Sequence, residues 1–164
     1  MRDRYHPAQK ALHWATAILI LAMIPAGLAM QNESAISDAL FTFHKNAGVL
    51  VLALMLTRLA LRFAYPPPPL NIPLAGVAHL THWLLYAVVI VMAVSGILRV
   101  LAGGFPLESL NAIGIVMEKN EALANRAKGV HWAAHYAVIG LVLLHIAAAL
   151  RHALRRDGVF SRML

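Results

Sequence analysis

The sequence predicts an all-α protein, a four-helix transmembrane bundle. Of its 164 residues, 60% are hydrophobic and only 13% are charged. Soluble domains average about 45–50% apolar and about 25% charged residues. Several apolar stretches are long enough, at about 20 residues or more, to cross a bilayer as helices in contact with lipid. Polar loops separate them, and we expect one domain covering residues 1–164.

The first two predicted spans cover about residues 8–30 and 39–63. Pro7 stands near the start of the first span, where its missing N–H removes no helical hydrogen bond. Histidines interrupt what would be the apolar core of a signal peptide, so we expect this span to be retained. The polar run QNESAISD separates the two spans. Their chemically notable side chains are His13, Trp14, His44, Arg58 and Arg62.

The third and fourth predicted spans cover about residues 74–101 and 128–153. The run YPPPPLNIP at 65–73 precedes the third span, and its prolines cannot continue a helix. The longest loop follows the third span, and within it ESLNAIG and EKNEALANRAK are candidates for a short interfacial helix. The histidines of these two spans and their ends are His79, His82, His131, His135, His145 and His152.

The basic residues predict the orientation. Four spans put both termini on one side of the membrane, and Lys and Arg gather on the cytoplasmic side of membrane proteins. We therefore expect cytoplasmic termini, and this bias explains the net charge of +7 without nucleic acid as a partner. The terminus side holds Arg2, Arg4, Lys10, Arg58, Arg62, Arg151, Arg155, Arg156 and Arg162; the opposite side holds Lys45, Arg99, Lys119, Arg126 and Lys128.

The fourth span carries the strongest functional signal. Between Val130 and Leu150 it has no Asp, Glu, Lys or Arg, yet it contains three histidines. A polar group without a partner in hydrocarbon is costly, so such residues usually have a function. His145 follows His131 by 14 positions. In a helix this step is a rotation of about 40° less than four full turns and a rise along the axis of roughly 21 Å. Both rings therefore leave one face, at a spacing that suits two haem irons, one in each leaflet.

Depth in the membrane pairs these histidines with partners on other spans. His13 and His145 lie toward the cytoplasm, and His44 and His131 lie toward the outside. Each pair can supply the two axial ligands of a haem iron, since bundle cores are where such sites are built. Filled axial positions leave no site for oxygen and favour electron transfer. Without cysteine, iron–sulfur ligation and thiolate-bound zinc are excluded.

Several motifs together resemble the bacterial cytochrome b561 family. They are HW at 13–14, H-x3-G at 44–48, LTRLALRFAYPPPP at 56–69, GVAHLTHWLLY at 76–86, and KGVH at 128–131 followed by a second histidine 14 residues on. This resemblance covers nearly the whole chain. It implies an inner-membrane protein with two haems b, whose axial ligands match His13, His44, His131 and His145.

The resemblance also implies an activity. Some members pass electrons from superoxide to ubiquinone, which implies a superoxide:ubiquinone oxidoreductase here. More distant dihaem proteins share a similar histidine layout, and these are cytochrome b subunits that receive electrons from a partner dehydrogenase or hydrogenase and pass them to quinone. A histidine-lined metal or proton transporter is the alternative from another class.

The remaining polar side chains have open roles. His82 lies at a depth similar to that of His13 and is a rival ligand; otherwise we expect it beside the inner haem or a quinone, where His152 is a second candidate. Arg58 and Arg62 are candidates for binding haem propionates or lipid phosphates. Lys45 and Lys128 are candidates for steering an anionic donor such as superoxide. We expect His135 to make a structural hydrogen bond, and His79 has no predicted role.

Overall fold

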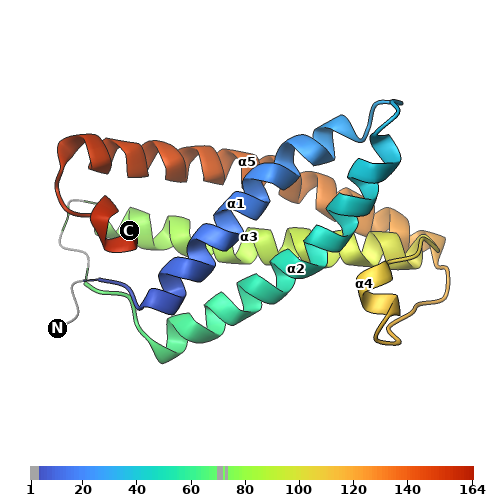
Figure 1. Cartoon of the computed structure of the whole chain (residues 1–164), viewed down its shortest axis with the longest axis horizontal. Helices are drawn as coiled ribbons and strands as arrows, with labels where there is room; N and C mark the ends of the chain where they lie inside the picture. The colour runs from blue at the N-terminus through green and yellow to red at the C-terminus, as the bar shows by residue number, and fades with distance from the viewer. Residues whose placement is uncertain (1–3, 70–71, 73) are drawn as a thin grey trace.

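The computed structural model describes residues 4–69, 72 and 74–164. Arg2, one of the basic residues in the orientation argument, lies outside the described residues. The described chain is helical, as predicted (Figure 1). Its elements are α1 (Pro7–Ala29), α2 (Ser37–Ala64), α3 (Ala75–Ala102), α4 (Glu108–Asn111), α5 (Glu121–Arg155) and a 3₁₀ helix (Phe160–Met163).

Four of the helices in the described residues, α1, α2, α3 and α5, are long and apolar enough to cross a membrane, which confirms the predicted fold class. The first three begin and end within two residues of the predicted bounds. The fourth begins at Glu121 rather than near residue 128, because Asn120 caps it and its Oδ1 accepts the Leu123 N–H at 3.0 Å. Within EKNEALANRAK, the run EALANRAK at 121–128 is therefore the polar start of α5, while ESLN forms α4.

The start of α1 is fixed to the end of α2. His6 caps α1 by accepting the Ala8 N–H at Nδ1, and Pro7 occupies the first turn. The Gln9 side-chain amide donates to the Leu61 and Tyr65 carbonyls at 3.3 and 3.0 Å. The Leu61 carbonyl also accepts the Tyr65 N–H at 2.8 Å, so the Gln9 amide adds to the capping of the end of α2 and ties α1 to it.

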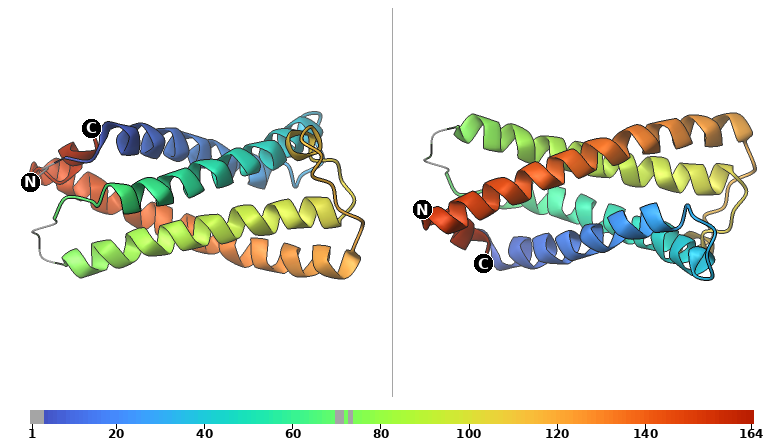
Figure 2. Two further views of the ribbon diagram at one scale, coloured as in Figure 1. Left: turned by 90° about the horizontal axis from the view of Figure 1, so that it is seen from below. Right: turned by 90° about the horizontal axis from the view of Figure 1, so that it is seen from above.

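The helices form two pairs that cross. α1 packs along α2 and α3 packs along α5, while α2 also contacts α3. Figures 1 and 2 show the α1–α2 pair running obliquely across the α3–α5 pair. Few or no close backbone approaches join α5 to α1 or to α2. Side chains that meet between α5 and either α1 or α2 therefore have more room than side chains between α3 and α5.

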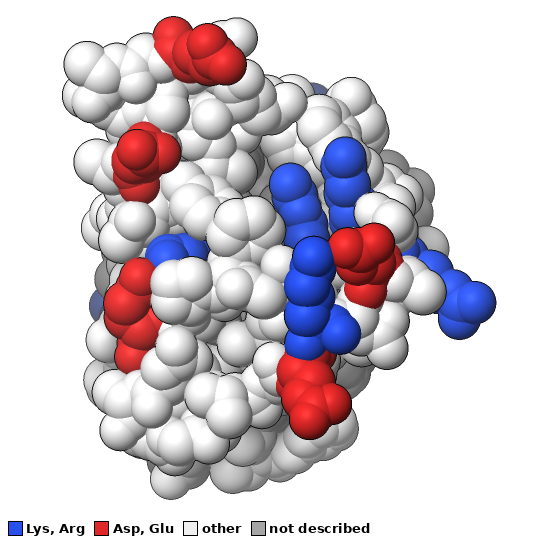
Figure 3. All heavy atoms as spheres, turned by 90° about the vertical axis from the view of Figure 1, so that its right-hand side faces the viewer, with Lys and Arg blue, Asp and Glu red and all other residues white. Residues whose placement is uncertain are grey.

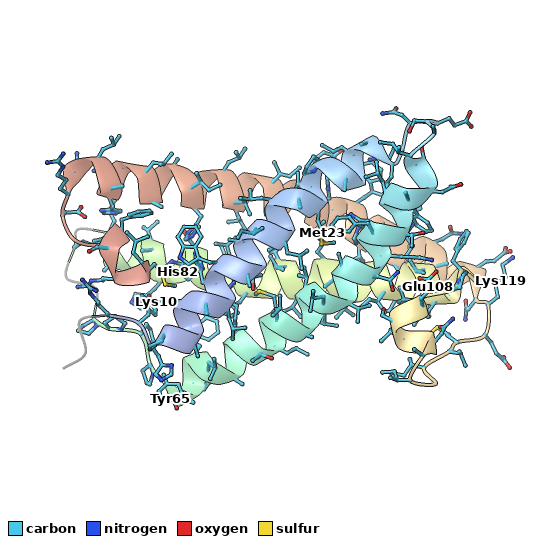
Figure 4. All side chains as sticks on the ribbon, viewed as in Figure 1. Lys10, Met23, Tyr65, His82, Glu108 and Lys119 are labelled. Atoms are coloured by element: carbon cyan, nitrogen blue, oxygen red, sulfur yellow. The ribbon has the colours of Figure 1, made fainter. Side chains whose placement is uncertain are left out.

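An apolar layer crosses the middle of the bundle. Val51 and Met55 of α2, Val89 of α3 and Val138 of α5 form a buried cluster. Met23 of α1, labelled in Figure 4, packs against it. Val138 is seven residues from both His131 and His145, so this layer separates the two ends of α5 that carry them.

The start of α1 and the C-terminal segment lie at one end of the bundle, opposite α4 (Figure 2). The Trp14 indole N–H donates to the Met163 carbonyl at 2.9 Å, and Arg162 donates to the Pro69 carbonyl at 2.8 Å. These bonds join α1, the α2–α3 connector and the 3₁₀ helix at one end of the bundle. Four spans, an even number, require the start of the first span and the end of the fourth to lie at the same end.

Candidate functional site

Two histidines face one another near the α4 end of the bundle. The rings of His44 on α2 and His131 on α5 have centroids 6.3 Å apart and planes at 85°. Both line a mostly apolar cavity of about 200 Å³, together with Met23, Phe41, Gly96 and Phe105. We call this the outer pair. Its helices belong to different pairs of the bundle, whose backbones leave more room between them than α3 and α5 do.

A second pair lies near the terminus end. The His13 ring on α1 and the His145 ring on α5 have centroids 6.1 Å apart. We call this the inner pair, and it too joins the α1–α2 layer to the α3–α5 layer. Fourteen residues of uninterrupted helix separate His131 from His145, which corresponds to roughly 21 Å along α5.

Both separations suit a shared metal ion. Two imidazole nitrogens on opposite sides of one ion, each about 2.0–2.1 Å from it, would put the ring centroids roughly 6.3 Å apart. The observed 6.3 and 6.1 Å agree with this value. The spacing of the rings therefore suits a haem iron held by two imidazoles at each site.

His131 is held in the tautomer that a ligand needs. Its Nδ1 lies 2.9 Å from the Met92 carbonyl and 3.5 Å from Ser95 Oγ. Because a carbonyl only accepts, Nδ1 carries the proton and donates it, which leaves the lone pair of Nε2 free. The Nδ1 of His44 is buried and makes no hydrogen bond of normal geometry with the described residues.

Two glycines leave the space that the rings of the outer pair occupy. A Cβ added at Gly27 would lie 2.9 Å from His44 Cε1, and one at Gly96 would lie 2.9 Å from His131 Cε1. Real Cβ atoms do not approach this closely, so a larger residue at either position would have to displace the ring. The sequence pattern did not single out these two positions, because each glycine and its histidine are on different helices.

His82 also lies close to His145. Their ring centroids are 5.6 Å apart, closer than His13 is to His145, and Figure 4 shows His82 between the helices. However, His82 is on α3, which packs directly along α5. A macrocycle cannot fit between two helices in such contact, so the geometry favours His13 over His82 as the partner of His145.

The two arginines of α2 have different surroundings. Arg58 Nη2 lies 3.2 Å from His13 Nδ1, and its Cζ is 5.4 Å from the Tyr86 ring centroid. Arg62 stacks on Trp83, with Cζ 4.9 Å from that ring. Only Arg58 therefore reaches the inner pair, although the sequence placed both on one helix face.

Lys45 is not a free surface cation. It is only 8% exposed, and its Nζ lies 2.7 Å from Glu108 Oε1 and 2.7 Å from the Pro106 carbonyl. Asn46 donates to the other Glu108 oxygen, and these hydrogen bonds lower the pKa of Glu108 to about 2. This ion pair leaves Lys45 little charge for attracting an anion, contrary to the role considered for it from the sequence.

Other cations are exposed at the same end. Figure 3 views this end directly, and many of its Lys and Arg side chains gather to one side of it. Arg126 and Lys128, both on the first turns of α5, are exposed. Lys128 keeps the position that its predicted role requires, whereas Lys119 is paired with Glu121 at 2.9 Å.

The Lys45–Glu108 pair predicts how the loop at 103–120 is held. Replacing Glu108 by Gln should speed hydrogen exchange of the loop amides several-fold at pH 7, because buried Lys45 loses its charged partner. The lowered pKa of Glu108 means that the pair is fully present above the ordinary Glu range and is lost as pH falls through about 2. Exchange in the native protein, corrected for its intrinsic pH dependence, should therefore be constant from about pH 5 to 8. Equal exchange in the Gln variant would contradict this assignment.

The other histidines are not part of either pair. His152 Nδ1 lies 2.6 Å from Asp157 Oδ2, and this bond lowers the pKa of Asp157. His79 is exposed. His135 lines the outer cavity, but it makes ring contacts with Trp132 and Tyr136 and no hydrogen bond to the described residues, which corrects the expected structural hydrogen bond.

Four membrane-spanning helices with two cross-layer pairs of imidazoles place the protein among the membrane cytochromes. The chain belongs to the prokaryotic cytochrome b561 family, whose sequence profile matches residues 4–164. It is accordingly a haem-containing membrane protein of electron transport. Membership of this family leaves the histidine-lined transporter without support.

Individual relatives agree with this assignment. The chain is 30% identical to the "Probable superoxide oxidase CybB" of Yersinia pestis, with 100% of this chain and 97% of the relative covered. It is 28% identical to "Cytochrome b561 homolog 2" and 27% identical to "Cytochrome b561 homolog 1" of Escherichia coli K12, with 99% of the chain covered in each case.

Proposed function

We propose that the protein carries electrons across the bacterial inner membrane through two haems b. His13 and His145 would hold the inner haem, and His44 and His131 would hold the outer haem. The observation that carries this proposal is the separation of the rings, 6.1 and 6.3 Å, between helices whose backbones make few or no close approaches. A haem with two axial imidazoles supplies one-electron transfer and has no open position for oxygen.

The proposed orientation has both termini in the cytoplasm. The outer pair then lies in the periplasmic half of the membrane and the inner pair in the cytoplasmic half. Support comes from the bias of Lys and Arg toward the terminus side.

The proposed donor is superoxide and the proposed acceptor is ubiquinone. Two superoxide ions each lose one electron and become O₂, while one quinone takes up two electrons and two protons to become quinol. The name of the Yersinia pestis relative supports this reaction. Exposed Lys128 favours approach of a small anion to the outer end, since surface charge raises encounter rates.

Quinone reduction is proposed near the inner pair. His82 is beside His145, and His152 is near the same end of α5, so either can contact the quinone. Arg58 is the better placed of the two arginines for a haem propionate, because it alone reaches His13. Arg62, stacked on Trp83, is closer to a role at the lipid headgroups.

The test uses the purified protein with its haems. Stopped-flow mixing with superoxide should reduce the haems, and added ubiquinone should reoxidise them with catalytic turnover. Lys128→Gln should slow the superoxide step severalfold at low ionic strength and less at high salt. A lack of reduction by superoxide, together with co-purification of a larger redox protein, would favour the alternative of a cytochrome b subunit fed by a dehydrogenase or hydrogenase.

The packing around the outer pair predicts the effect of a glycine substitution. Gly96→Ala should lower the occupancy of the outer haem, because the new Cβ would displace the His131 ring that Met92 holds. The haem-to-protein ratio from a pyridine haemochrome assay measures this loss. Gly140→Ala is the matched control, since a Cβ there meets no described atom of another helix within 4 Å. Two fully bound haems in the Gly96 variant would show that the glycine does not position the ring.

A further inference from the structure

Arg58 is a cation within the membrane-spanning part of α2 that has no carboxylate partner among the described residues. Its guanidinium contacts are His13 Nδ1 at 3.2 Å, Met55 Sδ at 3.8 Å and the Tyr86 ring at 5.4 Å. A charge at this depth is costly unless an anion accompanies it. The position of Arg58 therefore points to an anionic ligand beside the inner pair.

The hydrogen bond between Arg58 and His13 has a further consequence for ligation. A guanidinium can only donate, so Nδ1 of His13 must accept and the ring proton is on Nε2. A histidine that ligates through Nε2 needs the opposite tautomer, with the proton on Nδ1. Ligation through Nδ1 would instead compete with Arg58 for the same lone pair. The Arg58–His13 bond and a metal–His13 bond therefore exclude one another.

The outer pair has no such conflict. The Met92 carbonyl accepts from His131 Nδ1 and so fixes the ligating tautomer. Two cations line the outer cavity: Lys45 is paired with Glu108, and no hydrogen bond joins Arg99 to His44 or His131 among the described residues. The two haem sites therefore differ in what must happen before a histidine can bind iron.

We infer that the inner site selects a haem with free carboxylates, because a propionate must take Arg58 away from His13 before His13 can ligate. This inference rests on the proposed ligand pairs. Arg58 is a positioning residue that acts through the tautomer of His13. A carboxylate is the stronger partner for a guanidinium, since it accepts two parallel charge-assisted hydrogen bonds.

The test compares two porphyrins. The full-length protein is produced without a haem supply and titrated in detergent with iron protoporphyrin IX or with its dimethyl ester, which lacks free carboxylates. The native sequence should bind two equivalents of haem, but its inner site should bind the ester about tenfold to a hundredfold more weakly. In Arg58→Gln the inner site should bind both porphyrins with similar affinity. The readouts are the affinity of each binding step and the low-spin spectrum of the second haem.

Two further variants sharpen the comparison. Arg62→Gln is the matched control: it removes a cation one turn away on α2 that does not touch His13, so discrimination against the ester should persist. Arg58→Lys keeps the charge but cannot form the bidentate pair, so its discrimination should be intermediate, and it replaces the Gln variant if that protein does not fold. Equal binding of haem and ester by the native inner site would overturn the inference, as would unchanged discrimination in Arg58→Gln.

Two controls separate the causes of failure. Oleate added with the ester should not restore the inner site; a restored site would show that any lipid carboxylate releases Arg58 and would overturn selection by the porphyrin. His145→Ala should bind one porphyrin of either kind. If that variant binds two, the proposed ligand pairs are wrong, whatever the result with the ester.

Discussion

Replacing His145 by Ala is expected to remove the inner haem and to leave the outer haem bound. The ratio of haem to protein should fall from about two to about one, because an iron that loses one of two axial imidazoles loses much of its attachment to the bundle. The outer pair should persist, since the buried layer around Val138 separates it from the inner pair. A pyridine haemochrome assay gives the ratio, and a redox titration should show one step in place of two.

The reciprocal variant provides the control. His131→Ala should lose the outer haem and keep the inner one, so the two variants should retain different redox steps. Reduction by superoxide should fail in His131→Ala even though one haem remains, because electrons are proposed to enter at the outer site. Retention of both haems in either variant would disprove the pairing of α5 with two separate partners.

The second large effect is expected to distinguish His13 from His82. His13→Ala should lose the inner haem, whereas His82→Ala should keep two haems with low-spin spectra. The physical reason is the packing: His13 reaches His145 from the other layer, while His82 is on a helix that packs along α5. The measurement is again the haem-to-protein ratio, together with the spectrum of the remaining haem.

The opposite pattern would reassign the ligand. If His82→Ala loses the inner haem and His13→Ala retains it, the iron is held by α3 and α5, and the layer argument is wrong. A selective loss of quinone reduction in His82→Ala, with both haems present, would support its proposed contact with the quinone.

Much of the fold followed from the sequence because a membrane imposes a simple length scale. Apolar stretches of about 20 residues must be helical to satisfy their backbone hydrogen bonds in lipid. That rule predicted the ends of α1, α2 and α3 to within two residues of their positions in the structure. It placed the start of α5 too late, because the first turns of this helix are polar and depend on the Asn120 cap rather than on hydropathy.

The candidate site, too, was predictable from the sequence in part. Helical periodicity alone put His131 and His145 on one face. Depth suggested His44 as the partner of His131 and His13 as that of His145, with His82 as a rival that only the family resemblance disfavoured. The structure brings those pairs to 6.3 and 6.1 Å. Depth could not rank His13 against His82, since both lie at similar heights.

Only the tertiary structure decided which helices lie side by side. That lateral arrangement brings Arg58 to His13, pairs Lys45 with Glu108, and sets Gly27 and Gly96 against the outer rings. Hydrophobic periodicity reports the depth and the face of a residue along its own helix. It holds no information on the neighbour that this face will meet, because that depends on how all four helices pack together.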